Sequence, residues 1–195
     1  MRRIGAVVLA AGGSSRLGEA KQLLTFRGET LIRRAVRAAA GAGCDPIVVV
    51  IGKVGEEIRQ ELDGTGAKVV ENAEWQRGLG TSIRRGLTEI AASVDAIVLL
   101  TCDQPLVDRG VIAQLIATQE KTGKPIVASS YAKTRGVPAL FERACFEALL
   151  ALPDDSGAKK LIEEQADNVA SIAFEDGAID IDTAEDFERL KENRG

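Results

Sequence analysis

Short apolar runs rich in β-branched residues recur along the chain and predict the buried strands of a sheet. They cover residues 4–9, 47–51, 69–70, 96–100, 126–130 and 171–174. The segments between most of these runs have helical patterns, which predict helices over residues 30–40, 56–62, 81–92, 111–122, 143–150, 158–165 and 183–192. Strands that alternate with helices indicate a mostly parallel sheet with helices on both faces. The pattern therefore predicts an α/β domain.

The length and composition of the chain narrow the class of protein. A chain of 195 residues is enough for one well-packed domain and marginal for two, so we expect a single domain over residues 1–195. The 45% hydrophobic and 28% charged residues are typical of a soluble protein, and no apolar stretch is long enough to cross a bilayer. A core strand that begins at Ile4 argues against a signal peptide. The three cysteines have no paired spacing, so we expect a cytoplasmic protein without disulfides.

The charged and aromatic residues exclude several functions. A net charge of −4 and an aromatic content of 4% argue against nucleic acid as a partner. The chain has no histidine, which excludes Ser-His-Asp and Cys-His catalysis, imidazole bases and histidine-containing metal sites. Any acid–base or metal chemistry must therefore use carboxylates, lysine or the substrate itself.

A glycine-rich segment with two spaced cations follows the first predicted strand. It reads Leu9-Ala10-Ala11-Gly12-Gly13-Ser14-Ser15-Arg16-Leu17-Gly18-Glu19-Ala20-Lys21. The glycines let the backbone approach a bulky anion, and the free N–H groups of such a turn form an anion-binding concavity. The serines add hydroxyl donors, and Arg16 and Lys21 add positive charge. The composition of the segment predicts a cradle for a triphosphate.

Two familiar phosphate-binding motifs do not fit this segment. A dinucleotide fingerprint has the pattern G-x-G-x-x-G, whereas Gly12 and Gly13 are adjacent here and two basic residues follow them. A Walker-type loop has Gly-Lys followed by Ser or Thr, whereas Gln22 follows Lys21. The alternatives are a triphosphate cradle of another kind and a solvated glycine turn that closes an ordinary βα unit.

Aspartates at two places are candidates for holding a metal ion. Asp103 follows the fourth predicted strand, at the edge of the sheet where open α/β folds bind ligands. One such carboxylate opposite a phosphate loop is enough for Mg²⁺, and the alternative role is that of a helix cap. Alternating apolar and acidic residues around Asp180 and Asp182 predict a short edge strand. Thr183 and Asp186, which follow, are spaced as a capping box.

A third block, residues 72–87, joins a flexible entrance to a helix. Gly78 and Gly80 precede a helix whose first turn offers the hydroxyls of Thr81 and Ser82 and free backbone N–H groups. Such a helix start is suitable for a base edge or a ribose. A simple N-capped helix after a glycine turn explains the same residues.

Together these patterns resemble the nucleotidyltransferases of molybdenum-cofactor maturation, and most specifically their cytidylyltransferases. The resemblance spans nearly the whole chain and rests on six motifs, which are L-A-A-G-x-S-x-R-x-G-x-x-K from Leu9, N-x-x-W-x-x-G-x-x-x-S-[LI]-x-x-G-[LI] from Asn72, D-Q-P at Asp103, G-x-P-x-x-F from Gly136, G-D-x-G-A-[RK] up to Lys159 and D-x-D-T-x-x-D from Asp180. It implies a Rossmann-like fold of the nucleotide-diphospho-sugar transferase type. The N-terminal half would bind the nucleotide and the C-terminal half the acceptor. The family usually has histidine where this chain has Val137.

The resemblance also implies a reaction and a set of site residues. CMP would move from CTP to the terminal phosphate of molybdopterin or the molybdenum cofactor, with release of pyrophosphate. The implied nucleotide contacts are Leu9, Ala10, Ala11, Gly12, Gly13, Ser14, Arg16, Lys21, Gly80 and Ser82. The implied catalytic residues are Arg16, Lys21 and Asp103, and the implied ligands of Mg²⁺, with Mn²⁺ as the alternative, are Asp103 and Asp182. Ala11 favours CTP, because guanosine-using relatives tend to have glycine there.

The implied partners are CTP, molybdopterin or the molybdenum cofactor, and a molybdenum hydroxylase or its maturation chaperone, with no nucleic acid and no membrane. Arg135 and Lys159 are candidates for gripping the acceptor phosphate. Two other functions stay open. One is transfer from CTP or GTP to another phosphorylated acceptor, such as a sugar phosphate or phospholactate. The other is a non-catalytic module that binds nucleotide or pterin.

Overall fold

The architecture is a mostly parallel sheet between two layers of helices. The computed structural model describes residues 2–13, 20–52 and 55–194. Within these residues the sheet has seven strands in the order β5 (Lys68–Glu71), β4 (Ile47–Ile51), β1 (Ile4–Ala10), β6 (Ala96–Thr101), β8 (Thr134–Glu142), β7 (Ile126–Tyr131) and β9 (Val169–Ala173). Neighbouring strands are parallel except at β8, which is antiparallel to β6 and β7. The predicted fold class is confirmed.

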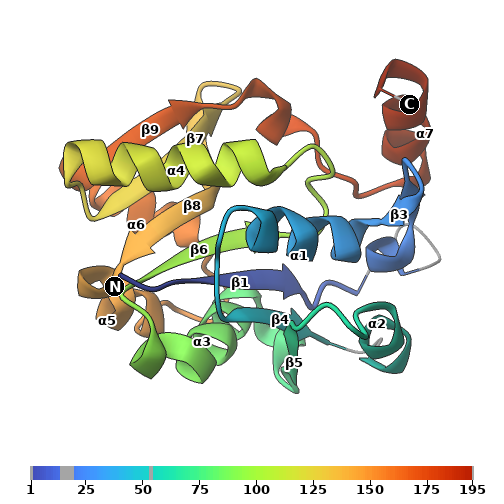
Figure 1. The fold of residues 1–195 in the computed structure, drawn as a ribbon, viewed down its shortest axis with the longest axis horizontal. Helices are drawn as coiled ribbons and strands as arrows, with labels where there is room; N and C mark the ends of the chain where they lie inside the picture. The colour runs from blue at the N-terminus through green and yellow to red at the C-terminus, as the bar shows by residue number, and fades with distance from the viewer. Residues whose placement is uncertain (1, 14–19, 53–54, 195) are drawn as a thin grey trace.

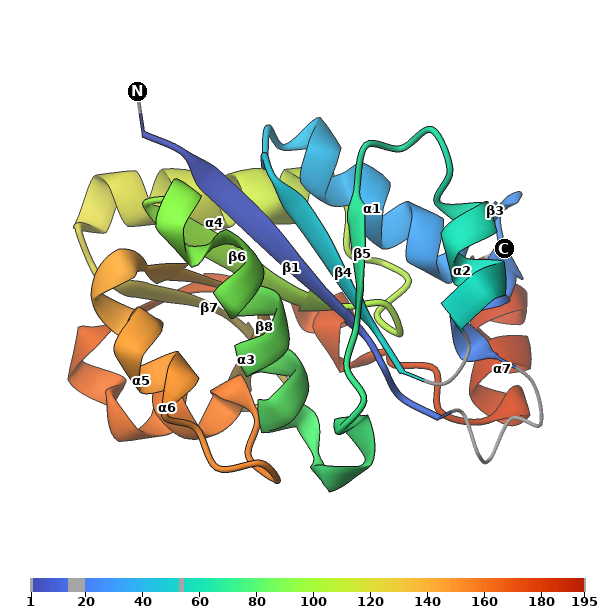
Figure 2. The same ribbon diagram turned by 90° about the horizontal axis from the view of Figure 1, so that it is seen from below.

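Alternate residues of the buried strands face the two helical layers. On β1, Ala6 and Val8 face one layer, and Val7 and Leu9 face the other. The first layer consists of α1 (Leu31–Gly41), α2 (Gly55–Glu61) and α4 (Arg109–Thr122) (Figure 1). The second consists of α3 (Leu79–Ile90), α5 (Phe146–Leu150) and α6 (Ala158–Glu164), which Figure 2 shows from below. Because both faces are covered, the strands are continuous apolar runs. Among the helices of the described residues, none has the length and apolar character needed to cross a bilayer.

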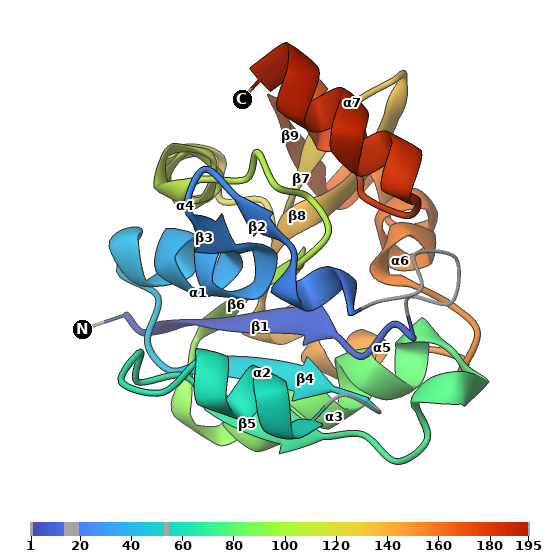
Figure 3. The same ribbon diagram turned by 90° about the vertical axis from the view of Figure 1, so that its right-hand side faces the viewer.

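A smaller apolar cluster holds the C-terminal helix beside the beginning of the chain. Helix α7 (Ala184–Arg194) packs near the two-stranded hairpin of β2 (Thr25–Phe26) and β3 (Glu29–Thr30) (Figure 3). The cluster, which we call the α7 cluster, consists of Leu24, Phe26, Leu31, Ile181, Phe187 and Leu190. It brings the segment before α7 next to the end of the glycine-rich segment.

Strand β8 is not predicted by the apolar pattern, because Gly136 and Pro138 interrupt it. The pairing with β7 shifts at this point, since Ala139 is opposite Ala128 whereas Gly136 is opposite Ser129. Pro138 therefore lies in a bulge, which is one of the few places where a sheet accepts a residue without an N–H group. The other six strands form where the sequence predicts them, with small differences at their ends.

The edge strand predicted around Asp180 and Asp182 is wrong. Residues 179–182 have no strand partner in the described structure. The N–H group of Ile181 instead donates to the carbonyl oxygen of Asp103 at 3.0 Å, and the Ile181 side chain is fully buried in the α7 cluster. The alternation of apolar and acidic residues therefore reflects the buried side chain of Ile181 between two exposed aspartates, and not a strand.

The predicted capping box forms at the start of α7. The N–H group of Thr183 donates to Oδ2 of Asp186 at 2.9 Å, and the N–H group of Asp186 donates to Oγ1 of Thr183 at 3.2 Å. The hydroxyl of Thr183 and the backbone N–H groups hold the pKa of Asp186 below its usual value.

Replacing Thr183 by alanine should lower the free energy of unfolding by about 1 kcal/mol, because the first-turn N–H group of Asp186 loses its partner. Urea unfolding measures this change, and Thr88→Ala, at an exposed position inside α3, is the matched control. The pKa of Asp186 is lowered on folding, so the stabilisation is present above the pKa of the unfolded chain. It is lost as the pH falls through the folded value. Equal stability of the two variants at neutral pH would contradict the role of the box.

Candidate functional site

A pocket of about 280 Å³ lies where the strands β1 and β6 end. Its walls come from three parts of the chain, which are the end of β1 with the glycine-rich segment, the end of β6, and the entrance to α3. The lining residues are Leu9, Ala10, Ala11, Gly12, Lys21, Trp75, Gln76, Gly78, Leu79, Ser82, Thr101, Cys102 and Asp103. The structure thus brings together most of the residues that the sequence singles out, at the sheet edge expected to bind ligands.

A cluster of opposite charges includes two residues of the pocket lining, Lys21 and Asp103, and a third residue outside the lining, Asp182. The Nζ atom of Lys21 lies 2.7 Å from Oδ2 of Asp103 and 3.0 Å from Oδ1 of Asp182. Lys21 is only 9% exposed. Burial alone lowers the pKa of its ammonium group, but the charge of Asp103 and the hydrogen bonds that Lys21 donates to both aspartates outweigh burial and raise the pKa above its usual value. Lys21 therefore carries its positive charge throughout the neutral range.

The segment that carries Asp182 is held against the loop after β6. The buried amide of Gln104 donates from Nε2 to the carbonyl oxygens of Val137 at 3.1 Å and Gly177 at 2.9 Å. The hydrogen bond from Ile181 to Asp103 adds a second tie. Gln104 therefore joins the D-Q-P loop to β8 and to the C-terminal segment, which places Asp182 beside Asp103.

A third aspartate lies close to these two. Partial desolvation raises the pKa of Asp180, and the negative charges of Asp182 and Asp103 raise it further. One oxygen of Asp103 and one of Asp182 contact the same ammonium group, that of Lys21, so the two carboxylates lie close enough to contact one cation. Carboxylate oxygens are also the ligands that Mg²⁺ or Mn²⁺ takes. Within the described residues no group of three or more His, Cys, Asp or Glu side chains forms a complete metal site. A divalent ion would therefore need phosphate or water oxygens as well.

Gln22 holds the start of the glycine-rich segment from inside the protein. Its Nε2 atom donates to the carbonyl oxygens of Ala10 at 2.7 Å and Gly12 at 2.9 Å, and its side chain is 1% exposed. The sequence does not single out Gln22 as a supporting residue, although its place next to Lys21 in the motif is a signal. Ser14 and Arg16, which the sequence places in the site, lie outside the described residues.

Trp75 packs against the other side of this segment. A Cβ atom on Gly13 would lie 2.7 Å from Cη2 of Trp75, and one on Gly52 would lie 2.9 Å from its Cγ. The indole ring therefore needs glycine at both positions. Because Trp75 also lines the pocket and is the only tryptophan of the chain, its fluorescence can report ligand binding there.

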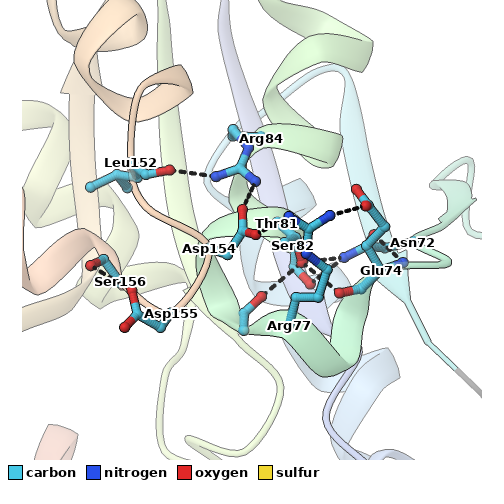
Figure 4. Close-up of polar contacts among 11 residues, drawn as sticks. Asn72, Glu74, Arg77, Thr81, Ser82, Arg84, Leu152, Asp154, Asp155 and Ser156 are labelled. Atoms are coloured by element: carbon cyan, nitrogen blue, oxygen red, sulfur yellow. Dashed lines mark hydrogen bonds and ion pairs between the residues drawn. The ribbon is translucent and has the colours of Figure 1, made fainter.

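A buried asparagine organises the entrance to α3 (Figure 4). The Nδ2 atom of Asn72 donates to Oγ1 of Thr81 at 2.8 Å and to Oγ of Ser82 at 3.0 Å. Its Oδ1 atom accepts from the N–H group of Glu74 at 3.0 Å. Ser82 lines the pocket, whereas Gly80 lies outside the lining and packs against the loop at positions 153–154.

Asp154 joins this entrance to the loop before α6. Its carboxylate forms ion pairs with Arg77 and Arg84, and its carbonyl oxygen accepts from the N–H group of Gly80 at 2.9 Å (Figure 4). The hydrogen bond with Arg84 is the main cause that holds the pKa of Asp154 below its usual value. Arg84 also donates to the carbonyl oxygen of Leu152. The loop in the expected acceptor half is thus fastened to a helix of the expected nucleotide half.

Two cations expected to grip an acceptor lie away from the pocket lining. Lys159 is exposed on α6, with Nζ 3.8 Å from Oε1 of Glu163. Arg135 lies on β8 opposite Ser130, at the β7–β8 hairpin. Because β8 runs antiparallel to β6, this hairpin is at the same edge of the sheet as the pocket.

Comparisons with known proteins agree with this geometry. Residues 6–169 match the MobA-like NTP transferase domain. The crystal structure of Rv0371c from Mycobacterium tuberculosis H37Rv has 34% identity and a TM-score of 0.82, and covers 99% of this chain and 100% of that chain. Rv0371c has also been solved in complex with manganese, with 32% identity, a TM-score of 0.79, and coverage of 98% of this chain and 99% of that chain.

Two curated relatives cover the chain to different extents. The bifunctional protein GlmU of Sorangium cellulosum is 35% identical over 130 residues, which are 63% of this chain and 28% of that protein. The chain thus spans about a quarter of that relative's length. The nicotine blue oxidoreductase of Paenarthrobacter nicotinovorans is 27% identical over 195 residues, with 94% of each chain covered.

Replacing Asn72 by alanine should lower the free energy of unfolding by about 1–3 kcal/mol, because buried hydroxyl and N–H groups lose their partner. It should also weaken nucleotide binding, measured by the fluorescence of Trp75, because Ser82 in the pocket is no longer held. Asn168→Ala, at an exposed position, is the control. A variant as stable as the control would show that Asn72 does not organise the helix entrance.

Proposed function

Since the chain belongs to the family of MobA-like NTP transferase domains, we propose that it is a nucleotidyltransferase that moves CMP from CTP to molybdopterin or the molybdenum cofactor. An oxygen of the acceptor's terminal phosphate attacks the α-phosphorus of CTP. The bond from the α-phosphorus to the oxygen that bridges to the β-phosphate breaks, and pyrophosphate leaves. The observation that carries the proposal is the Lys21–Asp103–Asp182 cluster at a pocket built on the glycine-rich segment.

The mechanism needs positioning and positive charge rather than a base. The attacking phosphate is already an anion, which fits a chain without histidine. Lys21 keeps its proton because its pKa is raised, so its ammonium group can neutralise phosphate oxygens but cannot accept a proton at neutral pH. Arg16, in the same segment, is proposed to contact the β- and γ-phosphates. The pocket walls hold the two anions in line for attack.

A divalent ion completes the proposed site. Asp103 and Asp182 would hold Mg²⁺ or Mn²⁺, and the ion supplies further charge neutralisation on the phosphate oxygens when it is bound. A complex of the similar Rv0371c with manganese supports this assignment. The ion would take carboxylate oxygens that now contact Lys21, and the ammonium group of Lys21 would add positive charge beside the phosphates.

The choice of CTP rests on the wall beside the glycine-rich segment. Ala11 lines the pocket and is 8% exposed, so its methyl group takes up space that a larger base would need. Leu79 lines the same pocket and is 45% exposed, which offers an apolar surface to a base. The recipient of the product is proposed to be a molybdenum hydroxylase or its maturation chaperone.

The direct test is release of pyrophosphate from CTP or GTP, measured with molybdopterin, a sugar phosphate, phospholactate or no acceptor. We expect release with CTP only when molybdopterin and Mg²⁺ are present. Release with a different acceptor would show that this other acceptor, and not molybdopterin, is the substrate. Nucleotide binding without release under any of these conditions would favour a non-catalytic module.

Replacing Asp103 by asparagine should lower turnover by at least about 100-fold, since one negative ligand is lost. CTP binding without a divalent ion, measured by Trp75 fluorescence, should persist because Lys21 remains. Asp167→Asn, at an exposed position, is the matched control. An unchanged rate in the Asp103 variant would refute its assignment as a metal ligand.

Replacing Ala11 by glycine should reduce the preference for CTP over GTP by about 10-fold in kcat/KM, because the pocket gains room for a purine. The ratio of pyrophosphate release rates with the two nucleotides measures this effect. A ratio equal to that of the wild type would remove the argument for CTP.

A further inference from the structure

A second cavity, with a volume of about 630 Å³, lies between α1 and α4. Four arginines line this cavity, which are Arg27, Arg34, Arg37 and Arg109. We call the cavity the arginine groove. The two helices lie on the same face of the sheet, as Figure 1 shows. The arginine groove shares no lining residue with the pocket around Lys21. The proposed transfer reaction therefore does not account for it.

The positive charge of the arginine groove is only partly compensated. Glu29 accepts from Nε of Arg37 at 2.9 and 3.0 Å. Asp108 uses Oδ1 to cap α4, where it accepts from the N–H group of Val111 at 3.0 Å. Within the part of the chain that the structure describes, the side chain of Arg109 has no ion pair or hydrogen bond. Arg109 thus adds an uncompensated positive charge to the arginine groove, in a protein whose net charge is −4.

The arginine groove is preorganised. Arg34 donates from Nη2 and Nε to the carbonyl oxygen of Pro105, at 3.0 and 3.3 Å. Its guanidinium carbon lies 5.1 Å from the centroid of the Phe26 ring, and that of Arg27 lies 5.0 Å from the same centroid. Phe26 is 1% exposed, so the ring is a fixed support for both cations.

The arginines also repel one another. Burial lowers the pKa of Arg34, and the charges of Arg37 and Arg27 lower it further, against the opposing effect of Glu29. A bound anion would remove this repulsion, because each of its negative charges lies close to several guanidinium groups. The electrostatics therefore favour an anionic ligand over a neutral one.

We propose that the arginine groove is a second ligand site, which binds a small molecule carrying two or more phosphate groups. Guanidinium groups match phosphate oxygens with paired hydrogen bonds, and several phosphates can engage arginines from different elements. A concave volume of this size is typical of sites for small molecules. The first turn of α4, which begins at Arg109, adds the partial positive charge of a helix start.

One segment of chain joins the arginine groove to the pocket. Asp103 lines the pocket, Pro105 accepts the hydrogen bonds of Arg34, and Asp108 lines the arginine groove. A ligand held by Arg34 and its neighbours therefore rests on the same loop that carries the proposed metal ligand.

The test is calorimetric titration of the full chain with sodium tripolyphosphate, without divalent ions, beside the same titration followed by Trp75 fluorescence. We expect two sites, of which only the one in the pocket changes the fluorescence. The double variant R37Q/R109Q should weaken the fluorescence-silent site by about 10-fold or more and leave the other unchanged. Separate titrations with pyrophosphate and CTP distinguish a free polyphosphate from a nucleotide as the source of the phosphate groups.

The control R59Q/K121Q removes the same charge at exposed positions outside the groove lining, and it should change neither affinity by more than about 2-fold. If the double variant does not fold, the single variant R109Q replaces it in the same titrations. The absence of a fluorescence-silent site in the wild type, or a silent site that survives R37Q/R109Q, would overturn the proposal, as would equal loss in the control. Because no turnover is measured, these results do not depend on the cytidylyl transfer proposed above.

Discussion

An ammonium group that is almost removed from water organises the candidate site. The charge of Lys21 can be buried only if opposite charges accompany it, because an unpaired buried ion is strongly destabilising. Asp103 and Asp182 supply these charges from positions 82 and 161 residues further along the chain. The ends of β1 and β6 and the C-terminal segment must therefore all reach their places before the charge is compensated. The site is a property of the whole fold.

The walls of the pocket are fixed by contacts that leave little room for adjustment. Gln22 holds the backbone at the end of β1 from below, and Trp75 covers Gly13 from the other side. Asn72 fixes the two hydroxyls at the start of α3. Such rigidity suits the proposed reaction between two anions, which repel each other and must be held in one geometry. In the proposed mechanism, the rigid walls position the two anions, and no group that transfers a proton is needed.

Much of the fold and part of the site could be predicted from the sequence, for local reasons. Buried parallel strands form long apolar runs, and residues that follow them, such as Asp103, meet at one edge of the sheet. The capping box of Thr183 is a local pattern as well. The ties between Asp154 and Arg84, or between Gln104 and Gly177, join residues about 70 positions apart and leave no such pattern. Their roles could not be predicted because side-chain pairing over such distances depends on the finished packing.

The carboxylate at position 182 belongs to a part of the chain that the sheet does not hold. The family match ends at residue 169, and the segment around Ile181 is attached through the burial of Ile181 in the α7 cluster, a backbone hydrogen bond to Asp103 and the amide of Gln104. Mutations in this tail can change the charge next to Lys21 while the strands keep their packing. The charge balance of the candidate site can thus be adjusted separately from the apolar core that supports it.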